Sequence, residues 1–568
     1  MIGSVKIKYN LIIILIGTLL LSGIATLSAG QDNSKPLNYY LKNLPFQMED
    51  IKEPSFPDHI VNVTEYGAIP DGHTINTQAF ADAIDACVQK GGGMVVIPPG
   101  TWVTGSIKLQ SNINLHIESG ALLQFSSRIE DFPLLQGLGG SSKKIVVAPL
   151  IYGYDLKNVA ITGGGIIDGA GEVWRPVKKE KQTNSQWKQL IASGGVVSSD
   201  GKIWWPSKEA MEGEAYLKEL ERTKQDRTRA DYAQAREYLR PNLVQLVQCN
   251  GILIDGPTVR NSPKFHLNPM RSENIIVRNI TIQTQWYAQN GDGLDISSCR
   301  NVVVYNTTVD AGDDAICIKP GKPGKDQPAG PTCENIVIAD CIVYHGHGGF
   351  VIGSESYGGA RNISVKNCTF IGTDVGLRFK SLRGRGGLVE NVYVDGIQMR
   401  NIENEAILFD MSYSEGDPER QAREGADSKR SEGVNGSTPH FRNFFIKNII
   451  CNGASRPLLI NGLPEMPVTD IQIENLYVES EKGVICLDAD SVFLRNVHLK
   501  TLKGSVVSLN QCRDFVFDRM VYPQNVELFL DVEGEKTDNI QLQSIDLTVA
   551  KKGIQFGKGV KPSAVIQK

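Results

Sequence analysis

Five aspartates crowd one short stretch of the chain, beside apolar runs such as AICI and VVVY. The stretch NGDGLDISSCRNVVVYNTTVDAGDDAICIKPG begins at residue 290, and its aspartates are Asp292, Asp295, Asp310, Asp313 and Asp314. Carboxylates gathered in this way act as acid and base on a substrate, hold a metal ion or cap turns. We expect Asp295 and Asp310 to be structural or turn residues, and the other three to do chemistry.

These three aspartates lie at the heads of two strands with similar patterns. DGLDIS begins at Asp292 and DAICIK begins at Asp314, and GGFVIG and GLRFKS follow farther along the chain. If the four are one strand in successive coils, Asp292 and Asp314 are neighbours at one inter-strand spacing of about 4.8 Å. Asp313 comes one residue earlier, and the position that matches it in the next coil is His347. The pattern therefore predicts three carboxylates with a histidine beside them.

Two cations follow on the last of these strands. Arg378 and Lys380 are two residues apart and so face the same side. Acids at one end and cations at the other suit hydrolysis of a sugar chain that itself carries carboxylates. Asp292 and Asp314 would activate a water, and Asp313, crowded by two like charges, would have the raised pKa of a general acid. In an inverting glycosidase the two carboxyl groups stand roughly 6.5–9.5 Å apart to leave room for that water.

A phrase that alternates apolar with other residues recurs along the chain. Strong copies begin with asparagine, at Asn158, Asn250, Asn274, Asn301, Asn335, Asn362, Asn391 and Asn443. Weaker copies begin at Asp470, Ser491 and Asp514. The usual spacing is about 21 to 29 residues, which predicts an all-β fold, a right-handed parallel β-helix with one coil per repeat. We expect each leading Asn at a turn, where its side chain bonds the backbone and tolerates left-handed geometry.

Two segments depart from the repeat. In residues 61–125 the run FADAIDACVQKGG has helical spacing and a glycine stop, which predicts a short helix that caps the open end. Residues 174–240 are charged and helix-prone, which predicts an inserted helical arm on the surface. We expect residues 61–568 to form a single β-helix catalytic domain that contains this insertion.

The N-terminus has the order of a secretory signal peptide. Lys6 and Lys8 precede the apolar run LIIILIGTLLLSGIA, and small residues follow in LSAGQ. We expect residues 1–30 to be a signal peptide and residues 31–60 a lead segment, in an exported protein, periplasmic or extracellular, without a membrane span after cleavage. A net charge of -4 gives no general attraction for nucleic acid. No CxxC, HExxH or Walker loop is present, and we expect no cofactor, no metal and a monomer.

The motifs together resemble those of glycoside hydrolase family 28, the polygalacturonase family, from about Val61 to about Thr548. Four motifs carry the resemblance: Asn290-Gly291-Asp292, Gly312-Asp313-Asp314, Gly346-His347-Gly348 and Arg378-Phe379-Lys380. The resemblance implies a β-helix and an inverting mechanism with Asp313 as general acid and Asp292 and Asp314 as bases. It also implies that His347 supports the acid and that Arg378 and Lys380 bind a galacturonate just past the scissile bond. Gly291 and Phe379 differ from the residues usual in the family, at positions that should not touch that bond.

Three further residues are predicted to contact substrate. Asn290 belongs to the first motif, Tyr413 is the candidate for a tyrosine that many family members have after the R-x-K strand, and His266 is a candidate for a subsite. Other basic residues leave strands on the proposed cleft side, as carboxylate ligands or as a solvated face: Lys319, Lys322, Lys325, Arg383 and Arg385.

The expected substrate is pectic polygalacturonan. The insertion and the long loop 414–441 are candidates for walls that block one end of a cleft, which favours exo action over endo action. A rhamnogalacturonan hydrolase is the alternative in the same class, although many of these replace one paired aspartate by glutamate. A calcium-dependent pectate lyase and a non-catalytic β-helix protein are the alternatives from other classes.

The ten cysteines are too dilute for a disulfide scaffold. Stacked coils would bring Cys299 near Cys333 and Cys341 near Cys368, as disulfides or as buried free thiols. Neither alternative gives them a role in the chemistry.

Overall fold

The computed structural model describes residues 35–137, 145–322, 332–413 and 431–568. The predicted signal peptide lies outside the described residues. Contacts divide the chain into two compact units, residues 1–42 and residues 43–568. The first unit contains helix α2 (Leu37–Leu41). Among the described residues, no helix has the length and apolar character needed to cross a membrane.

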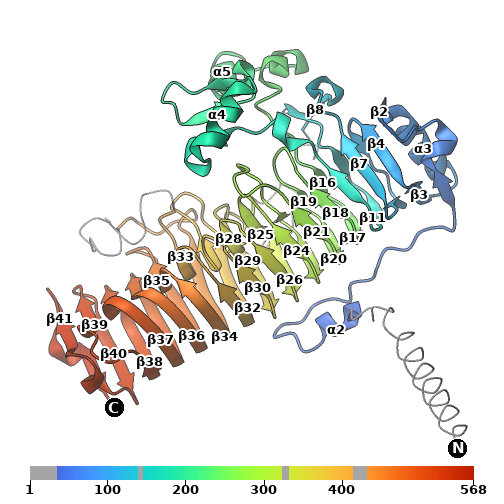
Figure 1. Cartoon of the computed structure of the whole chain (residues 1–568). Coiled ribbons are helices and arrows are strands. Elements are labelled where there is room, and N and C mark those ends of the chain that lie inside the picture. The colour runs from blue at the N-terminus through green and yellow to red at the C-terminus, as the bar shows by residue number, and fades with distance from the viewer. Residues whose placement is uncertain (1–34, 138–144, 323–331, 414–430) are drawn as a thin grey trace, which may run out of the picture. The chain divides into compact units, whose positions relative to one another are not determined.

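The second unit is the right-handed parallel β-helix that the repeats predict (Figure 1). Equivalent strands of successive coils stack into three parallel sheets. The first sheet carries the clustered aspartates and consists of β5 (Ile107–Lys108), β10 (Ile151–Tyr154), β16 (Val244–Val247), β19 (Leu267–Met270), β22 (Leu294–Ser297), β25 (Asp314–Lys319), β28 (Gly348–Ile352), β31 (Leu377–Lys380), β33 (Glu405–Asp410), β35 (Arg456–Asn461), β39 (Leu528–Glu533), β41 (Lys552–Phe556) and the last parts of β36 (Val468–Leu487) and β37 (Ala489–Asn510).

The other two sheets complete the coils. The second sheet consists of β1 (Ile60–Asn62), β3 (Gly93–Ile97), β6 (Ile113–Ile117), β11 (Lys157–Thr162), β17 (Asn250–Asp255), β20 (Glu273–Arg278), β23 (Arg300–Tyr305), β26 (Cys333–Ala339), β29 (Ala360–Lys366), β38 (Arg513–Val521), β40 (Asp538–Gln543), β42 (Val565–Gln567) and the first parts of β32 (Leu388–Arg400), β34 (His440–Ala454), β36 and β37. The third sheet consists of β2 (Asp71–Ile75), β4 (Gly100–Thr104), β7 (Ala121–Phe125), β12 (Ile166–Asp168), β18 (Thr258–Arg260), β21 (Thr281–Gln283), β24 (Thr308–Asp310), β27 (Ile342–Tyr344), β30 (Thr369–Ile371) and later parts of β32, β34, β36 and β37.

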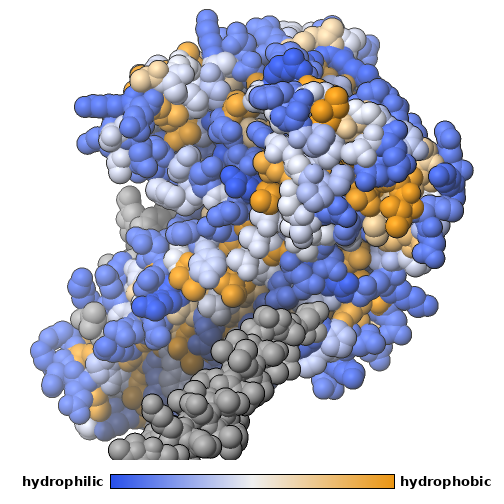
Figure 2. Space-filling model, turned by 45° about the vertical axis from the view of Figure 1, so that its right-hand side comes forward, coloured by the Kyte–Doolittle hydropathy of each residue, from blue (hydrophilic) through white to orange (hydrophobic). Residues whose placement is uncertain are grey.

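The strands of successive coils pair in register. In the first sheet Leu294 pairs with Ile316, which pairs with Phe350, which pairs with Leu377. All four side chains are buried in the hydrophobic core inside the coils, and burial of each contributes about 1.5–3 kcal/mol. Because alternate residues of a strand point to opposite sides, the outward positions of the same strands are left for polar groups. On the face in Figure 2, hydrophobic residues lie in separate patches between hydrophilic ones.

The leading asparagines form a ladder along one corner of the coils. Asn274, Asn301 and Asn335 have φ angles of 57°, 52° and 56°, in the left-handed region as predicted. Their amides bond from coil to coil: Asn301 donates to Asn274 at 3.4 Å, Asn335 to Asn301 at 3.1 Å, and Asn362 to Asn335 at 3.0 Å. The expected bond to the local backbone is therefore wrong here, because stacking at one inter-strand spacing brings identical amides within reach.

Helix α3 (Thr77–Gln89) covers the N-terminal end of the β-helix (Figure 1). Its residues Phe80, Ile84 and Cys87 are buried in the main core. It ends at the predicted glycine stop, where Gly91 has a φ of 93°. The predicted cap is present, and it protects the first coils from edge pairing.

The insertion over residues 174–240 is only partly the predicted surface arm. It contains helices α4 (Asn184–Ala192), α5 (Lys208–Thr223) and the 3-10 helix η5 (Arg229–Ala235). An antiparallel sheet of short strands was not predicted: β13 (Val177–Lys178), β14 (Val196–Val197) and β15 (Ile203–Trp205). Trp174 and Tyr232 are buried in the main core, so the segment is anchored to the β-helix and not a free arm.

The remaining described elements are short. Strands β8 (Leu134–Gln136) and β9 (Ile145–Val147) form an antiparallel pair. The 3-10 turns are η1 (Val63–Tyr66), η2 (Ile129–Asp131), η3 (Gly171–Val173), η4 (Lys179–Lys181), η6 (Leu547–Val549) and η7 (Pro562–Ala564). All ten cysteines are buried free thiols, so the second of the two alternatives for them is observed.

Candidate active site

Consecutive coils of the first sheet bring the predicted acids together. Because Leu294 pairs with Ile316, Asp292 and Asp314 stand at equivalent positions two residues earlier. Carboxylate oxygens of Asp292, Asp313 and Asp314 all lie within 4.8 Å of one another. The predicted cluster is therefore present, on the outward side of the first sheet.

The carboxylates are closer together than an inverting glycosidase is expected to hold them. The predicted separation was roughly 6.5–9.5 Å, whereas the nearest oxygens lie within 4.8 Å. The reason is geometric, since adjacent coils stack at about 4.8 Å. The spacing does not by itself indicate inversion, which therefore requires a separate test.

Asp314 is buried and is neutralised by cations from two coils away. Its side chain is 4 % exposed, and Lys380 Nζ donates to its Oδ2 at 2.8 Å. Arg378 Nη1 lies 3.5 Å from its Oδ1. Burial raises the pKa of Asp314, but the charges of Lys380, Arg378 and Lys319 together outweigh burial and leave the pKa below its usual value. Asp314 is thus ionised, as a base must be.

Asp292 shares a buried ammonium group with Asp295. Lys319 Nζ lies 2.8 Å from Asp292 Oδ2 and 3.1 Å from Asp295 Oδ2. Burial, together with the charge of Asp295, raises the pKa of Asp292 well above its ordinary value, although Lys319 opposes the shift. Burial raises the pKa of Asp295 to about 6. Asp295 is therefore a buried strand residue that acts on Asp292, and not a turn residue.

Asp313 is held by the predicted histidine. His347 Nδ1 lies 3.0 Å from Asp313 Oδ1. The raised pKa predicted for Asp313 is wrong for this structure: burial would raise the pKa, but the hydrogen bond from His347 and the charges of Lys380 and Lys319 outweigh burial and lower it. The raised pKa in the cluster belongs to Asp292 instead.

The cationic end of the site contains Tyr413 as predicted. Its ring centre lies 5.6 Å from the Arg378 guanidinium and 5.0 Å from Lys380 Nζ. Arg378 donates from Nη1 to His347 O at 3.1 Å, and its side chain is 16 % exposed. Lys380 is 6 % exposed and committed to Asp314, so Arg378 has the better access to a ligand.

His266 is not a subsite residue. It is completely buried before β19, and its Nδ1 lies 2.8 Å from Asp292 O while its Nε2 accepts from Ser262 N at 3.2 Å. Burial lowers its pKa to about 4, so it is neutral. With no exposed surface it cannot contact substrate, and it fixes the backbone at Asp292 instead.

The insertion supplies residues that the sequence did not single out. Arg240, at its end, donates to Asn290 Oδ1 at 2.7 Å and to Gln289 O at 2.9 Å. Lys181 Nζ lies 3.3 Å from His347 Nε2. A lysine ammonium has only donors, so His347 accepts at Nε2 and carries its proton on Nδ1, toward Asp313. Neither Lys181 nor Arg240 lies in a motif, and a charged run such as KKEK is indistinguishable from a solvated face.

Three of the other basic residues, Lys319, Arg383 and Arg385, bind acids of the protein itself. Lys319 is buried between Asp292 and Asp295 as described. Arg383 lies 2.7 Å from Glu465, and Arg385 lies 3.7 Å from Glu355. Lys322 lies 4.8 Å from the ring centre of Tyr357, and Lys325 is outside the described residues. Asp310, at the end of β24, pairs with His345 at 2.9 Å and is structural as predicted.

The three aspartates also have the composition of a metal site. However, Lys319 and Lys380 each place an ammonium nitrogen 2.8 Å from one of their oxygens. A divalent cation would have to displace two buried ammonium groups, whose removal from paired carboxylates costs several kcal/mol. The donor set therefore favours proton transfer over metal binding.

Comparison with known proteins agrees with this geometry. The family model described as "Glycosyl hydrolases family 28" matches residues 183–482. A second model, described as "Rhamnogalacturonase A/epimerase, pectate lyase-like", matches the capping region at residues 60–122.

Similar sequences and solved structures carry related names. A "Probable polygalacturonase" of Vitis vinifera is 26 % identical over 430 residues, which is 74 % of each chain. An "Exo-poly-alpha-D-galacturonosidase" of Dickeya chrysanthemi is 29 % identical over 365 residues, 63 % of this chain and 58 % of that protein. An exopolygalacturonase structure from Thermotoga maritima has a TM-score of 0.61 and 27 % identity, covering 83 % of this chain and 93 % of that one.

Proposed function

The chain belongs to glycosyl hydrolases family 28, and from this premise we propose that it hydrolyses the galacturonosyl linkages of pectic polygalacturonan from one end of the polymer. The observation that carries the proposal is the cluster of three carboxylates with a cationic end at Arg378 and Lys380. A polymer with a carboxylate on each sugar matches that charge arrangement. The polygalacturonase names of the similar proteins support the same substrate.

Asp313 is the proposed general acid, and Asp292 and Asp314 are the proposed bases. Before substrate arrives, the lowered pKa of Asp313 and the raised pKa of Asp292 leave the proton of the cluster on Asp292. A substrate carboxylate beside Arg378 and Lys380 adds negative charge, which opposes ionisation of Asp313 and raises its pKa. Asp313 then takes up the proton that it donates to the glycosidic oxygen, while Asp314 and the now ionised Asp292 orient the attacking water.

The insertion supports exo action. Its residues Lys181 and Arg240 contact His347 and Asn290, so the insertion lies against the aspartate cluster. Beside Lys181, Trp286 is 52 % exposed, with its ring centre 5.6 Å from Lys181 Nζ. A wall with an exposed indole and an ammonium group suits a terminal acidic sugar, which explains why the proposal is exo and not endo cleavage.

Product analysis on de-esterified polygalacturonate in the presence of chelator tests this function. We expect saturated monomer from the first time points and, by proton NMR, an inverted anomer as the initial product. A ladder of saturated oligomers would contradict exo action, and a retained anomer would contradict inversion. Unsaturated products that require calcium would identify a lyase. Hydrolysis of rhamnogalacturonan but not of polygalacturonate would identify rhamnogalacturonan as the substrate.

Export is part of the proposal, because an enzyme for a plant polymer acts outside the cytoplasm. The support is the N-terminal sequence, with Lys6 and Lys8 before an apolar run. Fractionation of cells that express the full chain, followed by N-terminal sequencing, tests it. A mature protein that starts near residue 30 is the expected result, and an uncleaved cytoplasmic protein is the contrary one.

A further inference from the structure

A second polar pocket lies farther along the first sheet, toward the C-terminus. The register runs from Arg378 through Leu408, Leu459 and Ile485 to Ser508. At about 4.8 Å for each coil, Ser508 lies roughly 20 Å from Arg378. The pocket around Ser508 has a volume of about 470 Å³, which is within the size range of ligand sites.

The pocket is separate from the aspartate cluster. Between them, Asp410, Leu459 and Asn461 are buried, and Asn461 donates to Asp410 at 2.9 Å. Beside this stretch, the ion pair of Arg383 and Glu465 at 2.7 Å joins two loops. A ligand in the pocket therefore occupies a site of its own.

A bulge in the sheet creates the hollow. Lys482 pairs with Lys503, but the next regular pair is Val484 with Val507, so β37 has extra residues at this point. A side chain at Gly483 would collide with the bulged backbone, whereas one at Gly504 would meet open space. Bulges re-aim side chains and interrupt pairing, and they are common beside binding sites.

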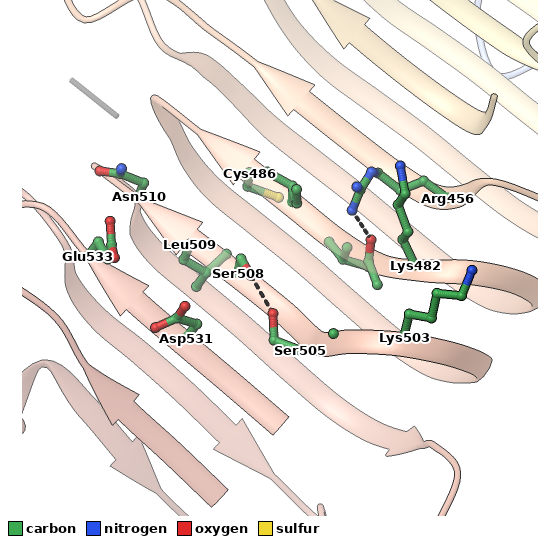
Figure 3. Close-up of a pocket in the computed structure, with 14 residues that line it drawn as sticks. Arg456, Lys482, Cys486, Lys503, Ser505, Ser508, Leu509, Asn510, Asp531 and Glu533 are labelled. Carbon is green, nitrogen blue, oxygen red and sulfur yellow. Dashed lines mark hydrogen bonds between the residues drawn. The ribbon is translucent and has the colours of Figure 1, made fainter. Parts of the chain in front are cut away.

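Opposite charges line opposite sides of the pocket (Figure 3). Lys482 and Lys503 stand on one side, with the buried Arg456 behind them, where its Nη1 donates to Gly483 O. Asn510, Asp531 and Glu533 stand on the other side. Between the two sides, the hydroxyls of Ser505 and Ser508 are 2.6 Å apart.

Two groups in the pocket have capacity for a ligand. Oδ1 of Asp531 is buried and has no hydrogen-bond partner among the described residues, and burial raises the pKa of this carboxyl. The side chain of Lys503 is 74 % exposed, and Glu481 is 3.8 Å away. Asp531 therefore offers an acceptor for a hydroxyl, and Lys503 offers a cation that can reach a carboxylate.

We propose that this pocket is a second carbohydrate-binding site, which holds an acidic sugar of the pectic chain through Lys482 and Lys503 on its carboxylate and through Asp531 and Asn510 on its hydroxyls. The identity of the polymer rests on the proposed function. Charged side chains of both signs in the lining do not suit a lipid or an apolar ligand, because buried polar groups without partners are costly. It does suit a ring that carries several hydroxyls and one negative charge.

A second site changes how the enzyme holds a polymer. A chain bound in the pocket is tethered at high effective concentration beside the aspartate cluster. The pocket therefore lowers KM for long substrates and has no effect on a disaccharide that cannot reach both sites.

Calorimetry with trigalacturonate tests binding directly, in the catalytically silent Asp313→Asn background of the full chain. We expect two sites, of which one becomes about tenfold weaker in Lys503→Glu. Asp531→Ala should weaken the same site by several-fold, because its acceptor is lost. Lys157→Glu is the matched control, since Lys157 is also exposed, but on the second sheet and far from the pocket; it should leave both sites unchanged.

Three results would overturn the inference: a single binding site, equal effects of Lys503→Glu and Lys157→Glu, or equally tight binding of an uncharged galactan oligomer. Kinetics separate this proposal from the function proposed above. In the active enzyme, Lys503→Glu should raise KM on polygalacturonate several-fold and leave kcat/KM on digalacturonate unchanged. Absence of galacturonan hydrolysis would refute the function, while the calorimetric result would still decide the pocket.

Discussion

The coils that carry the aspartate cluster and the coils near the C-terminus share one core but differ at one corner. In the coils of β22, β25 and β28, the chain breaks its strand between the third and first sheets, and the acids and His347 stand at that break. In β36 and β37 the strand continues through all three sheets, over residues 468–487 and 489–510. The comparison teaches that every coil stabilises the fold, whereas the chemistry depends on the broken corners.

The two regions also differ in what they bury. Around the cluster, Asp292, Asp295, Asp314 and Lys380 are buried, and Lys319, which pairs with two of these aspartates, is 16 % exposed. Buried ion pairs contribute little to stability and cost several kcal/mol when one partner is removed. The C-terminal coils fill the equivalent space mainly with aliphatic side chains, such as Ile485 and Leu487. Stability is therefore more sensitive to single substitutions of charged residues in the site coils.

The largest expected effect is on activity, from Asp313→Asn. Loss of the proposed acid should lower kcat at least about a thousandfold, with a melting temperature close to that of the parent. Asp310→Asn is the control, because the same substitution three residues earlier alters a carboxyl that pairs with His345 outside the cluster. Kinetics on polygalacturonate check both variants. Similar losses of kcat in the two would contradict the proposal that the aspartate cluster carries the catalysis.

The register of the cluster was predictable because a β-helix repeats its corners. The repeated Asn phrases show which residues of successive coils occupy equivalent positions. Counting residues from them therefore placed Asp292 beside Asp314 and Asp313 beside His347. The burial of His266 was not predictable, because the same position in a strand can face a cleft or lie beneath a loop. Its bond to Asp292 O exists only once the 262–266 turn has folded over it.

The sequence also could not predict which aspartate of the cluster has the raised pKa. Three aspartates predicted a raised pKa somewhere, but its place depends on which cations reach which oxygen. Lys319 stands in a basic run for which a carboxylate ligand of substrate and a solvated face were both open, yet it lies between Asp292 and Asp295. Lys181 reaches His347 from a segment 166 residues away, a contact that no local pattern encodes.

The second effect is on stability, from Lys319→Met. The substitution leaves Asp292 and Asp295 buried without their shared cation, which should lower the free energy of unfolding by about 3–5 kcal/mol. Lys503→Met, in the C-terminal coils, alters a side chain that is 74 % exposed. This substitution should change the free energy of unfolding by less than about 0.5 kcal/mol. Urea denaturation of both variants measures the difference, and a loss below about 1 kcal/mol for Lys319→Met would refute the account of this buried pair.

The third effect depends on pH and comes from Asp295→Asn. In the folded protein the pKa of Asp295 is about 6, against an ordinary value of 3.8, so between these values the folded state binds the proton more tightly than the unfolded state. The stabilisation of the folded state by protonated Asp295 is therefore fully present below about pH 4 and is lost as the pH rises through 6. Asparagine does not ionise, so the variant should gain stability relative to the parent by up to about 3 kcal/mol from pH 4 to pH 7. Denaturation at several pH values measures this difference, and a constant offset would contradict the raised pKa.

The smallest effect tests whether the scaffold is the same in both regions. Asn335, in the site coils, belongs to the ladder of leading asparagines and bonds Asn301 and Asn362. Asn475, in the C-terminal coils, belongs to a second ladder five residues farther along each coil and bonds Asn448 and Asn496. Both have a left-handed backbone, with φ angles of 56° and 55°. Alanine at either position loses two amide bonds and strains the backbone, for a loss of about 2 kcal/mol, whereas glycine relieves the strain and should recover about 1 kcal/mol. Equal losses by urea denaturation would mean that the two asparagine ladders stabilise the site coils and the C-terminal coils alike. A larger loss for Asn335 would mean that the coils with a broken strand depend more on their asparagine bonds.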